Sequence, residues 1–175
     1  MKRLTARDVV FCALFTALIA VFSQLALPIG PVPVSLATFG VMLCGLMLGW
    51  KRGALSVAVY ILLGLAGAPV FAGLQGGAGR LLGPTGGYIV GYMPCAILSA
   101  LRIRSIRNQF FSSCAALILG TAACYALGTA WFMLQSGRAL LDSLTLCVLP
   151  FLPGDAAKVV LAALLAPRLK KAVSL

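Results

Sequence analysis

The 175-residue sequence contains no histidine and only 3 acidic residues. Without histidine, a serine–histidine nucleophile pair and a histidine proton relay are both excluded. Three carboxylates are too few for the paired acid–base sites of most hydrolases. The six cysteines include no CxxC pair, and a closed zinc site needs clustered Cys and His. We therefore expect neither an enzyme nor a metal protein, and the cysteines read as small apolar fillers of a packed interior.

Charged residues are also scarce. They make up 10% of the chain, whereas a soluble domain carries about 25%. Apolar residues make up 62%, and the mean hydropathy is +1.08, which is typical of a membrane protein. The net charge of +11 could suggest a nucleic-acid partner, but such a protein gathers its basic residues on one exposed polar face. Here they form short clusters between long uncharged runs, so no nucleic-acid partner is expected.

The uncharged runs are long enough to cross a bilayer, which takes about 20 apolar residues per helix. The first run is longer than the core of a secretory signal and is interpreted as the first span. Proline and glycine at 28–33 separate it from the second. We predict an all-α integral membrane protein with six transmembrane helices in one bundle, forming a single membrane domain over residues 1–175. The expected helices cover residues 9–27, 35–50, 54–68, 84–101, 112–134 and 153–168, with a glycine-rich outer loop at 71–83.

The positive charges orient this bundle, because cytoplasmic ends are rich in Lys and Arg. With the N-terminus inside, only Arg80 and Arg138 fall in outer loops, and Lys158 falls within the sixth helix. An even number of helices is required for this bias, so both termini are expected to be cytoplasmic. The eleven expected inner residues are Lys2, Arg3, Arg7, Lys51, Arg52, Arg102, Arg104, Arg107, Arg168, Lys170 and Lys171.

Asp155 and Lys158 interrupt an otherwise apolar helix. An ionisable group at membrane depth costs at least about 2.5–3.5 kcal/mol, so it needs a reason to be there. Their i, i+3 spacing places them on one helix face, and Asp155 lies near the helix start, where the dipole favours an anion. From Arg168 at the inner boundary, the helix rises roughly 20 Å to Asp155, which lies in the outer half of the bilayer. Either the two charges only pair with each other, or they line a polar pocket that opens to the outside.

A glycine-rich stretch, GLQGGAGRLLGPTGGY at 73–88, is expected on the same outer side. Irregular backbone at membrane depth is tolerated where it is buried in protein or lines a cavity. Gln75, Arg80, Thr85 and Tyr88 supply hydrogen-bonding groups there. Because Gly79 is followed by Arg-Leu rather than Lys-Ser/Thr, the stretch is no P-loop, and ATP hydrolysis by this chain is excluded.

Small residues recur on the first expected helix, at Ala13, Ala17 and Ala20. Such spacing lets helices approach closely. From the spacing alone, packing within the bundle and docking onto another membrane protein remain equally open.

Three stretches together resemble the BioY family, the biotin-specific substrate-binding (S) components of energy-coupling factor (ECF) vitamin transporters. The resemblance covers nearly the whole chain and is most specific in its PTGGY and PGDxxK motifs; the fifth helix and residues 135–146 match least. Where family members often read T-L-Q-T-F, this chain has S-L-A-T-F at 35–39, so Ala37 replaces a polar side chain. The stretches are PIGPVPVSLATFGVMLCGLMLG (28–49), GLAGAPVFAGLQGGAGRLLGPTGGYIVGY (64–92) and LPFLPGDAAKVVLAALLA (149–166).

The resemblance implies a six-helix prokaryotic protein of the plasma membrane that binds biotin near the outer surface and needs no cofactor. It implies that Asp155 accepts the ureido N–H groups, while Lys158 contacts either the ureido oxygen or the ligand carboxylate. Arg80 is a second candidate for the carboxylate, and Gln75, Tyr88, Thr38 and Thr85 are expected to line the cavity.

The resemblance also implies partners. These are a transmembrane scaffold subunit and two cytosolic ATPase subunits, with Ala13 and Ala17 docking the scaffold. Two other functions remain open from the residues: the same fold could bind another vitamin or precursor, or the chain could be an intramembrane transferase.

Overall fold

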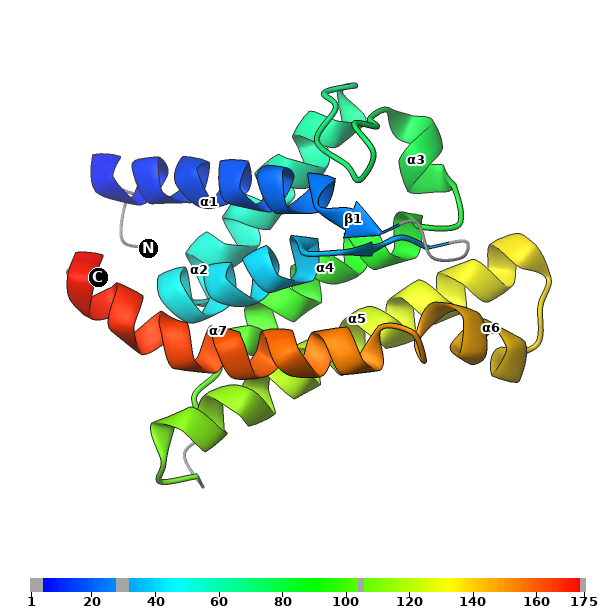
Figure 1. Ribbon diagram of the computed structural model, residues 1–175. Helices are drawn as coiled ribbons and strands as arrows, with labels where there is room; N and C mark the ends of the chain where they lie inside the picture. The colour runs from blue at the N-terminus through cyan, green and yellow to red at the C-terminus, as the bar shows by residue number, and fades with distance from the viewer. Residues whose placement is uncertain (1–4, 28–31, 104–105, 174–175) are drawn as a thin grey trace.

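The computed structural model describes residues 5–27, 32–103 and 106–173, and within them the chain is mostly helical (Figure 1). Residues 28–31 of the proline-containing loop expected at 28–33, and the basic residues Lys2, Arg3 and Arg104, lie outside the described residues. Two short strands, β1 (Ala26–Leu27) and β2 (Val34–Ser35), pair antiparallel. The helices are α1 (Ala6–Gln24), α2 (Ala37–Leu65), α3 (Ala78–Leu82), α4 (Gly86–Ser99), α5 (Gln109–Ser136), α6 (Leu140–Cys147) and α7 (Leu152–Val173).

Helix α1 begins at a capping box. The Thr5 side chain accepts from the Asp8 amide (3.3 Å), and the Asp8 carboxylate accepts from the Thr5 amide (3.0 Å). The same carboxylate lies 3.0 Å from the Arg52 guanidinium on α2. Asp8 therefore has a structural use: it caps α1 and joins the start of that helix to α2.

Helix α2 contains a break between two helical arms, as expected for helices at 35–50 and 54–68, but the break lies at Gly49 rather than at residues 51–53. The structure has one assigned helix, Ala37–Leu65, broken only at Gly49, where φ is +80°. Glycine adopts this conformation without the Cβ penalty, so one residue suffices for the bend, and residues 51–53 are helical. A Cβ on Gly53 would lie 3.3 Å from the Gly45 Cα, although eight residues of straight helix span about 12 Å. The chain thus folds back at Gly49, and the two arms of α2 pack against each other.

Other boundaries also differ from expectation. The glycine-rich loop contains the short helix α3, and an unpredicted helix, α6, precedes α7 at an angle of 56°. Helix α7 continues past residue 168 to Val173. Within the described residues, three helices, α1, α2 and α5, are long and apolar enough to cross a membrane, or four if α6 and α7 form one bent span; α4 is a shorter apolar helix.

Glycines allow α4 to pack closely between α2 and α5. A Cβ on Gly45 of α2 would lie 2.4 Å from the Ala96 carbonyl oxygen of α4. A Cβ on Gly128 of α5 would lie 2.3 Å from the ring of Tyr88 on α4. These contacts hold the bundle core together, and they also fix the orientation of the Tyr88 ring.

We expect Gly45→Ala to lower the thermal unfolding midpoint by roughly 5 °C, because overpacking costs about 1–3 kcal/mol and each kcal/mol shifts a domain of this size by about 2–4 °C. The matched control is Gly154→Ala on α7, where an added Cβ meets nothing within 4 Å. Differential scanning fluorimetry of the detergent-purified protein measures both. Equal midpoints for the two variants would contradict close α2–α4 packing.

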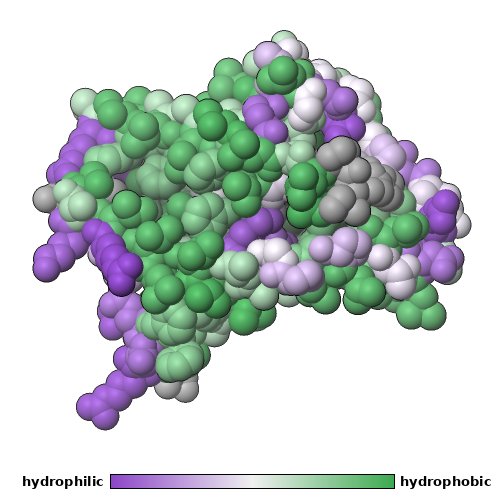
Figure 2. Space-filling model, viewed as in Figure 1, coloured by the Kyte–Doolittle hydropathy of each residue, from purple (hydrophilic) through white to green (hydrophobic). Residues whose placement is uncertain are grey.

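The molecule has two polar ends and an apolar middle. The start of α1 and the end of α7 lie at the same end (Figure 1), where the Arg7 guanidinium donates to the Val173 carbonyl (3.1 Å). Figure 2 shows hydrophilic residues at that end and around α3 at the opposite end, with a broad hydrophobic surface between them. This distribution is that of a multi-pass membrane protein.

Candidate functional site

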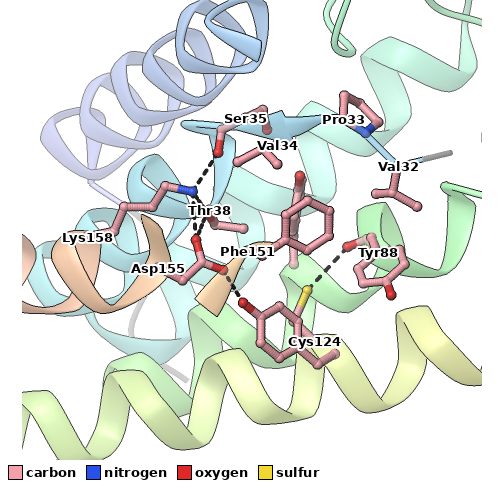
Figure 3. Close-up of a pocket in the computed structure, with 12 residues that line it drawn as sticks. Val32, Pro33, Val34, Ser35, Thr38, Tyr88, Cys124, Phe151, Asp155 and Lys158 are labelled. Carbon is pink, nitrogen blue, oxygen red and sulfur yellow. Dashed lines mark hydrogen bonds and ion pairs between the residues drawn. The ribbon is translucent and has the colours of Figure 1, made fainter. Parts of the chain in front are cut away.

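The candidate site lies at the end of the bundle away from the termini, where β2 and the starts of α2, α4 and α7 meet the middle of α5 (Figure 3). Pro153 and Gly154 lie in the first turn of α7, so Asp155 is placed near the helix start, as the sequence predicts. Asp155 is 5% exposed and Lys158 is 7% exposed. Two opposite charges are therefore buried side by side in an apolar bundle.

Asp155 and Lys158 do more than pair with each other. Lys158 Nζ lies 2.6 Å from Asp155 Oδ1 and also donates to the Ser35 carbonyl (2.7 Å) and to Thr38 Oγ1 (3.0 Å). Its three donors thus have three acceptors. Asp155 Oδ1 also accepts from Thr38 (3.4 Å), and Oδ2 accepts from the Tyr125 hydroxyl. The carboxylate retains unused acceptor capacity, since its two oxygens offer about four lone-pair sites.

Side chains around this pair form a first pocket, whose apolar wall includes Tyr92, Cys124 and Phe151. A second pocket lies beside it, and Val32, Pro33, Ser35, Tyr88 and Tyr92 line both. The second pocket is polar at its far side, where Arg80 is half-buried and Thr85 is buried. The Thr85 hydroxyl makes no hydrogen bond within the described residues. Because they share these five lining residues, the two pockets adjoin, with the acid–base pair in the first and the Arg80 cation in the second.

The free volume is small in this conformation, about 40 Å³ in the first pocket and about 30 Å³ in the second. Such a volume holds about one water molecule, whereas ligand sites usually measure about 300–1,000 Å³. Residues 32–35 and Phe71 form part of the lining, so they have to move before a vitamin-sized molecule can enter.

The predicted site residues fall into three groups. Thr38 joins Asp155 and Lys158 in the first pocket, and Arg80 and Thr85 lie in the second. Tyr88 lines both pockets with its ring, while its hydroxyl bonds Thr129 (3.2 Å) and the Cys147 carbonyl (3.4 Å). Gln75 stands apart, since its side chain is exposed and lines neither pocket, and its backbone pairs with Phe71.

Outside the pockets, Ala13 and Ala17 are both exposed on α1. Ala37, which replaces a polar residue of the family pattern, is 1% exposed at the start of α2 and is not part of either lining.

Sequence reasoning missed Tyr125, the side chain that donates to Asp155 Oδ2. It comes from α5, the segment with the weakest family resemblance. A tyrosine in the middle of an apolar run was the available signal, since a buried tyrosine hydroxyl usually finds a partner. Phe151 and Tyr92 were missed as well, because pocket walls and ordinary core aromatics have the same sequence pattern.

The described residues contain no group of three or more Cys, Asp or Glu placed to hold a metal ion. The buried polar cluster consists instead of a carboxylate, an ammonium, two hydroxyls and a backbone carbonyl. Groups of this kind interact through hydrogen bonds and charge rather than through metal coordination. The fold and the site together define an α-helical, multi-pass membrane protein with a buried acid–base pair in a small pocket.

Comparisons with known proteins agree with this class. The BioY family model matches residues 1–175. The biotin transporter BioY of Thermotoga maritima is 40% identical over 166 residues, covering 94% of this chain and 96% of that protein. The biotin transporter BioY of Rhodobacter capsulatus is 38% identical over 173 residues, covering 91% of each. The crystal structure of the S-component for biotin from an ECF-type ABC transporter matches with a TM-score of 0.86 and 35% identity, covering 94% of this chain and 91% of that one. The chain therefore belongs to the BioY family.

Proposed function

We propose that this protein binds biotin and acts as the substrate-binding component of an ECF-type transporter. The observation that carries this proposal is the buried cluster of Asp155, Lys158 and Thr38, which places a carboxylate with spare acceptor capacity beside a buried ammonium. Biotin presents a planar urea with two N–H donors and one oxygen acceptor, and this cluster complements both. The names of the relatives support the same ligand.

The two pockets suggest how biotin lies. The ureido ring fits the Asp155 end if Thr38 gives up its contacts to both charges. The carboxylate then accepts the two N–H groups, and the Lys158 ammonium donates to the ureido oxygen in place of Thr38. The thioether ring and aliphatic arm fit between the aromatic walls. The carboxylate reaches Arg80 and the Thr85 hydroxyl, for which the described residues supply no hydrogen-bond partner. In this arrangement Lys158 donates to the ureido oxygen, and Arg80 forms an ion pair with the carboxylate.

Arg80→Gln tests this assignment. We expect about tenfold weaker binding of biotin, because a hydrogen bond to a charged group contributes about 1.5–3 kcal/mol and Arg80 is only half-buried. Biotin methyl ester carries no negative charge, so its affinity should be the same in wild type and variant. Isothermal titration calorimetry with both ligands measures the difference. The control is Arg138→Gln, an exposed arginine after α5; a loss that is equal for the acid and the ester would place the carboxylate elsewhere.

The reversal at Gly49 supports six spans, namely α1, the two arms of α2, α4, α5 and α7, with both termini in the cytoplasm of a prokaryotic cell. In this topology the site faces outward in the plasma membrane. The exposed Ala13 and Ala17 then provide a close-approach face for the transmembrane scaffold subunit, which two cytosolic ATPase subunits drive. The protein itself is no enzyme, and biotin is its cargo.

Competition binding tests the choice of ligand. Unlabelled biotin should displace labelled biotin from the purified protein, whereas thiamine and riboflavin, which lack the cyclic urea, should not. Dethiobiotin keeps the urea and the carboxylate and should compete partially. Displacement by thiamine or riboflavin would indicate a different vitamin on the same fold.

A further inference from the structure

The turn at 71–75 covers one side of the second pocket and is held in an unfavourable shape. Phe71 and Gln75 exchange two backbone hydrogen bonds (2.9 and 3.2 Å), which closes the turn. Between them Gly73 has φ +76° and Leu74 has φ +54°, a conformation that a non-glycine residue adopts only at an energetic cost. Leu74 is also 70% exposed, so burial of its side chain does not offset that cost. Contacts from outside the turn have to stabilise it.

Gln24, the last residue of α1, supplies these contacts. Its Nε2 lies within hydrogen-bonding distance of the carbonyls of Val70 (3.2 Å), Phe71 (3.2 Å) and Pro69 (3.4 Å), and also of the Ala20 carbonyl on α1 itself (3.2 Å). Its Oε1 accepts from the Leu74 amide (2.9 Å). One side-chain amide thus engages both strands of the turn, and the Leu74 amide that it binds belongs to the residue with the strained φ.

The turn matters to the pocket through Phe71. This ring is 1% exposed and lines the second pocket. It packs edge-on against Tyr60 at 5.5 Å and fits a space on α2 left by Gly64, where a Cβ would lie 2.0 Å from the ring. The Tyr60 hydroxyl in turn bonds Ser23, the neighbour of Gln24 on α1 (2.7 Å). The end of α1 therefore fixes both the turn and the aromatic wall that the turn inserts.

We infer that Gln24 is a positioning residue that holds the 69–75 segment closed over the second pocket and so slows release of the bound ligand. This inference rests on the proposed function for its ligand, but the contact itself can be measured without one. Opening the pocket requires Phe71 to leave its place, and the Gln24 hydrogen bonds oppose that movement.

Two variants test the inference. Gln24→Leu removes every contact, whereas Gln24→Glu keeps an acceptor for the Leu74 amide and replaces the donor that faces the carbonyls. The control, Gln109→Leu, alters an exposed glutamine at the start of α5. Hydrogen–deuterium exchange of residues 69–76, without ligand, reports on the turn, the dissociation rate of labelled biotin reports on function, and the unfolding midpoint reports on folding.

We expect Gln24→Leu to speed exchange in 69–76 and the release of biotin by about tenfold each, with exchange in the core of α5 unchanged. Gln24→Glu should also speed release, which separates loss of the donor from loss of folding. Wild-type exchange rates in both variants would overturn the inference, and so would faster exchange with an unchanged dissociation rate. Absence of biotin binding in the wild type would instead overturn the proposed function, while the exchange experiment would still decide whether Gln24 holds the turn.

Discussion

Replacing Asp155 with asparagine is expected to weaken biotin binding by about 100-fold or more. Asparagine has nearly the same size but a neutral carbonyl in place of the carboxylate, and a hydrogen bond to a charged group contributes about 1.5–3 kcal/mol. Both N–H groups of the ureido ring lose the charged acceptor in this variant. The change also leaves the Lys158 ammonium without its counter-charge in a buried site, which disfavours the closed pocket further. Equilibrium binding of labelled biotin measures the effect.

The matched control is Asp142→Asn, which removes the same charge from an exposed position in the first turn of α6. Its affinity for biotin should equal that of the wild type, because Asp142 lines neither pocket. If Asp155→Asn bound as tightly as the control, Asp155 and Lys158 would be a structural pair only, and the ureido ring would bind elsewhere.

The second large effect concerns Lys158→Met. Removing one partner of a buried ion pair costs about 3–5 kcal/mol, since the other charge is left uncompensated. Asp155 keeps its contacts to Thr38 and Tyr125, but these are single hydrogen bonds from neutral groups. We therefore expect a lower unfolding midpoint together with roughly tenfold to 100-fold weaker biotin binding.

The double variant Asp155→Asn/Lys158→Met separates the two roles of the pair. It buries no charge, so its unfolding midpoint should lie above that of either single variant, a non-additivity expected of contacting residues. Biotin affinity should not recover with stability, because both ligand partners are gone. Recovery of binding in the double variant would mean that the pair shapes the pocket without touching biotin.

Much of this site was predictable because buried charge is rare in a membrane protein. Asp155 and Lys158 stand out in an apolar helix, and the structure places both in the first pocket with Thr38. The positive charges at the helix ends also predict the depth of the pair, in the outer half of the bilayer. Arg80 and Thr85 were predicted as lining residues because irregular backbone at membrane depth is expected to line a cavity. Both residues line the second pocket.

The remaining contacts depend on how segments distant in the sequence meet, which one sequence does not encode locally. Tyr125 reaches Asp155 from 30 positions away, and the Lys158 ammonium binds the Ser35 carbonyl from 123 positions away. In the sequence Gln24 is only a polar residue near the end of the first expected helix. The structure shows that it hydrogen-bonds residues about 50 positions further along the chain. Gln75 was predicted to line the cavity because it is a polar residue in the glycine-rich stretch, but its exposed side chain is not part of either lining.

The helices, too, were predictable in part and not in full. The apolar runs predicted mostly helical structure, but the reversal inside α2 was expected as a loop at 51–53 because Lys51 and Arg52 interrupt the run there. In the structure the chain reverses at Gly49, a glycine with a positive φ that precedes the expected loop. Helix α6 was missed because its short length and its mixture of polar and apolar residues resemble a loop.

Biotin binding is the central claim, and equilibrium binding of radiolabelled biotin to the purified wild-type protein tests it most directly. We predict saturable binding that approaches one biotin per chain, that unlabelled biotin displaces and that Asp155→Asn abolishes at the same concentrations. An absence of saturable binding by folded protein, or binding that Asp155→Asn leaves unchanged, would contradict the account.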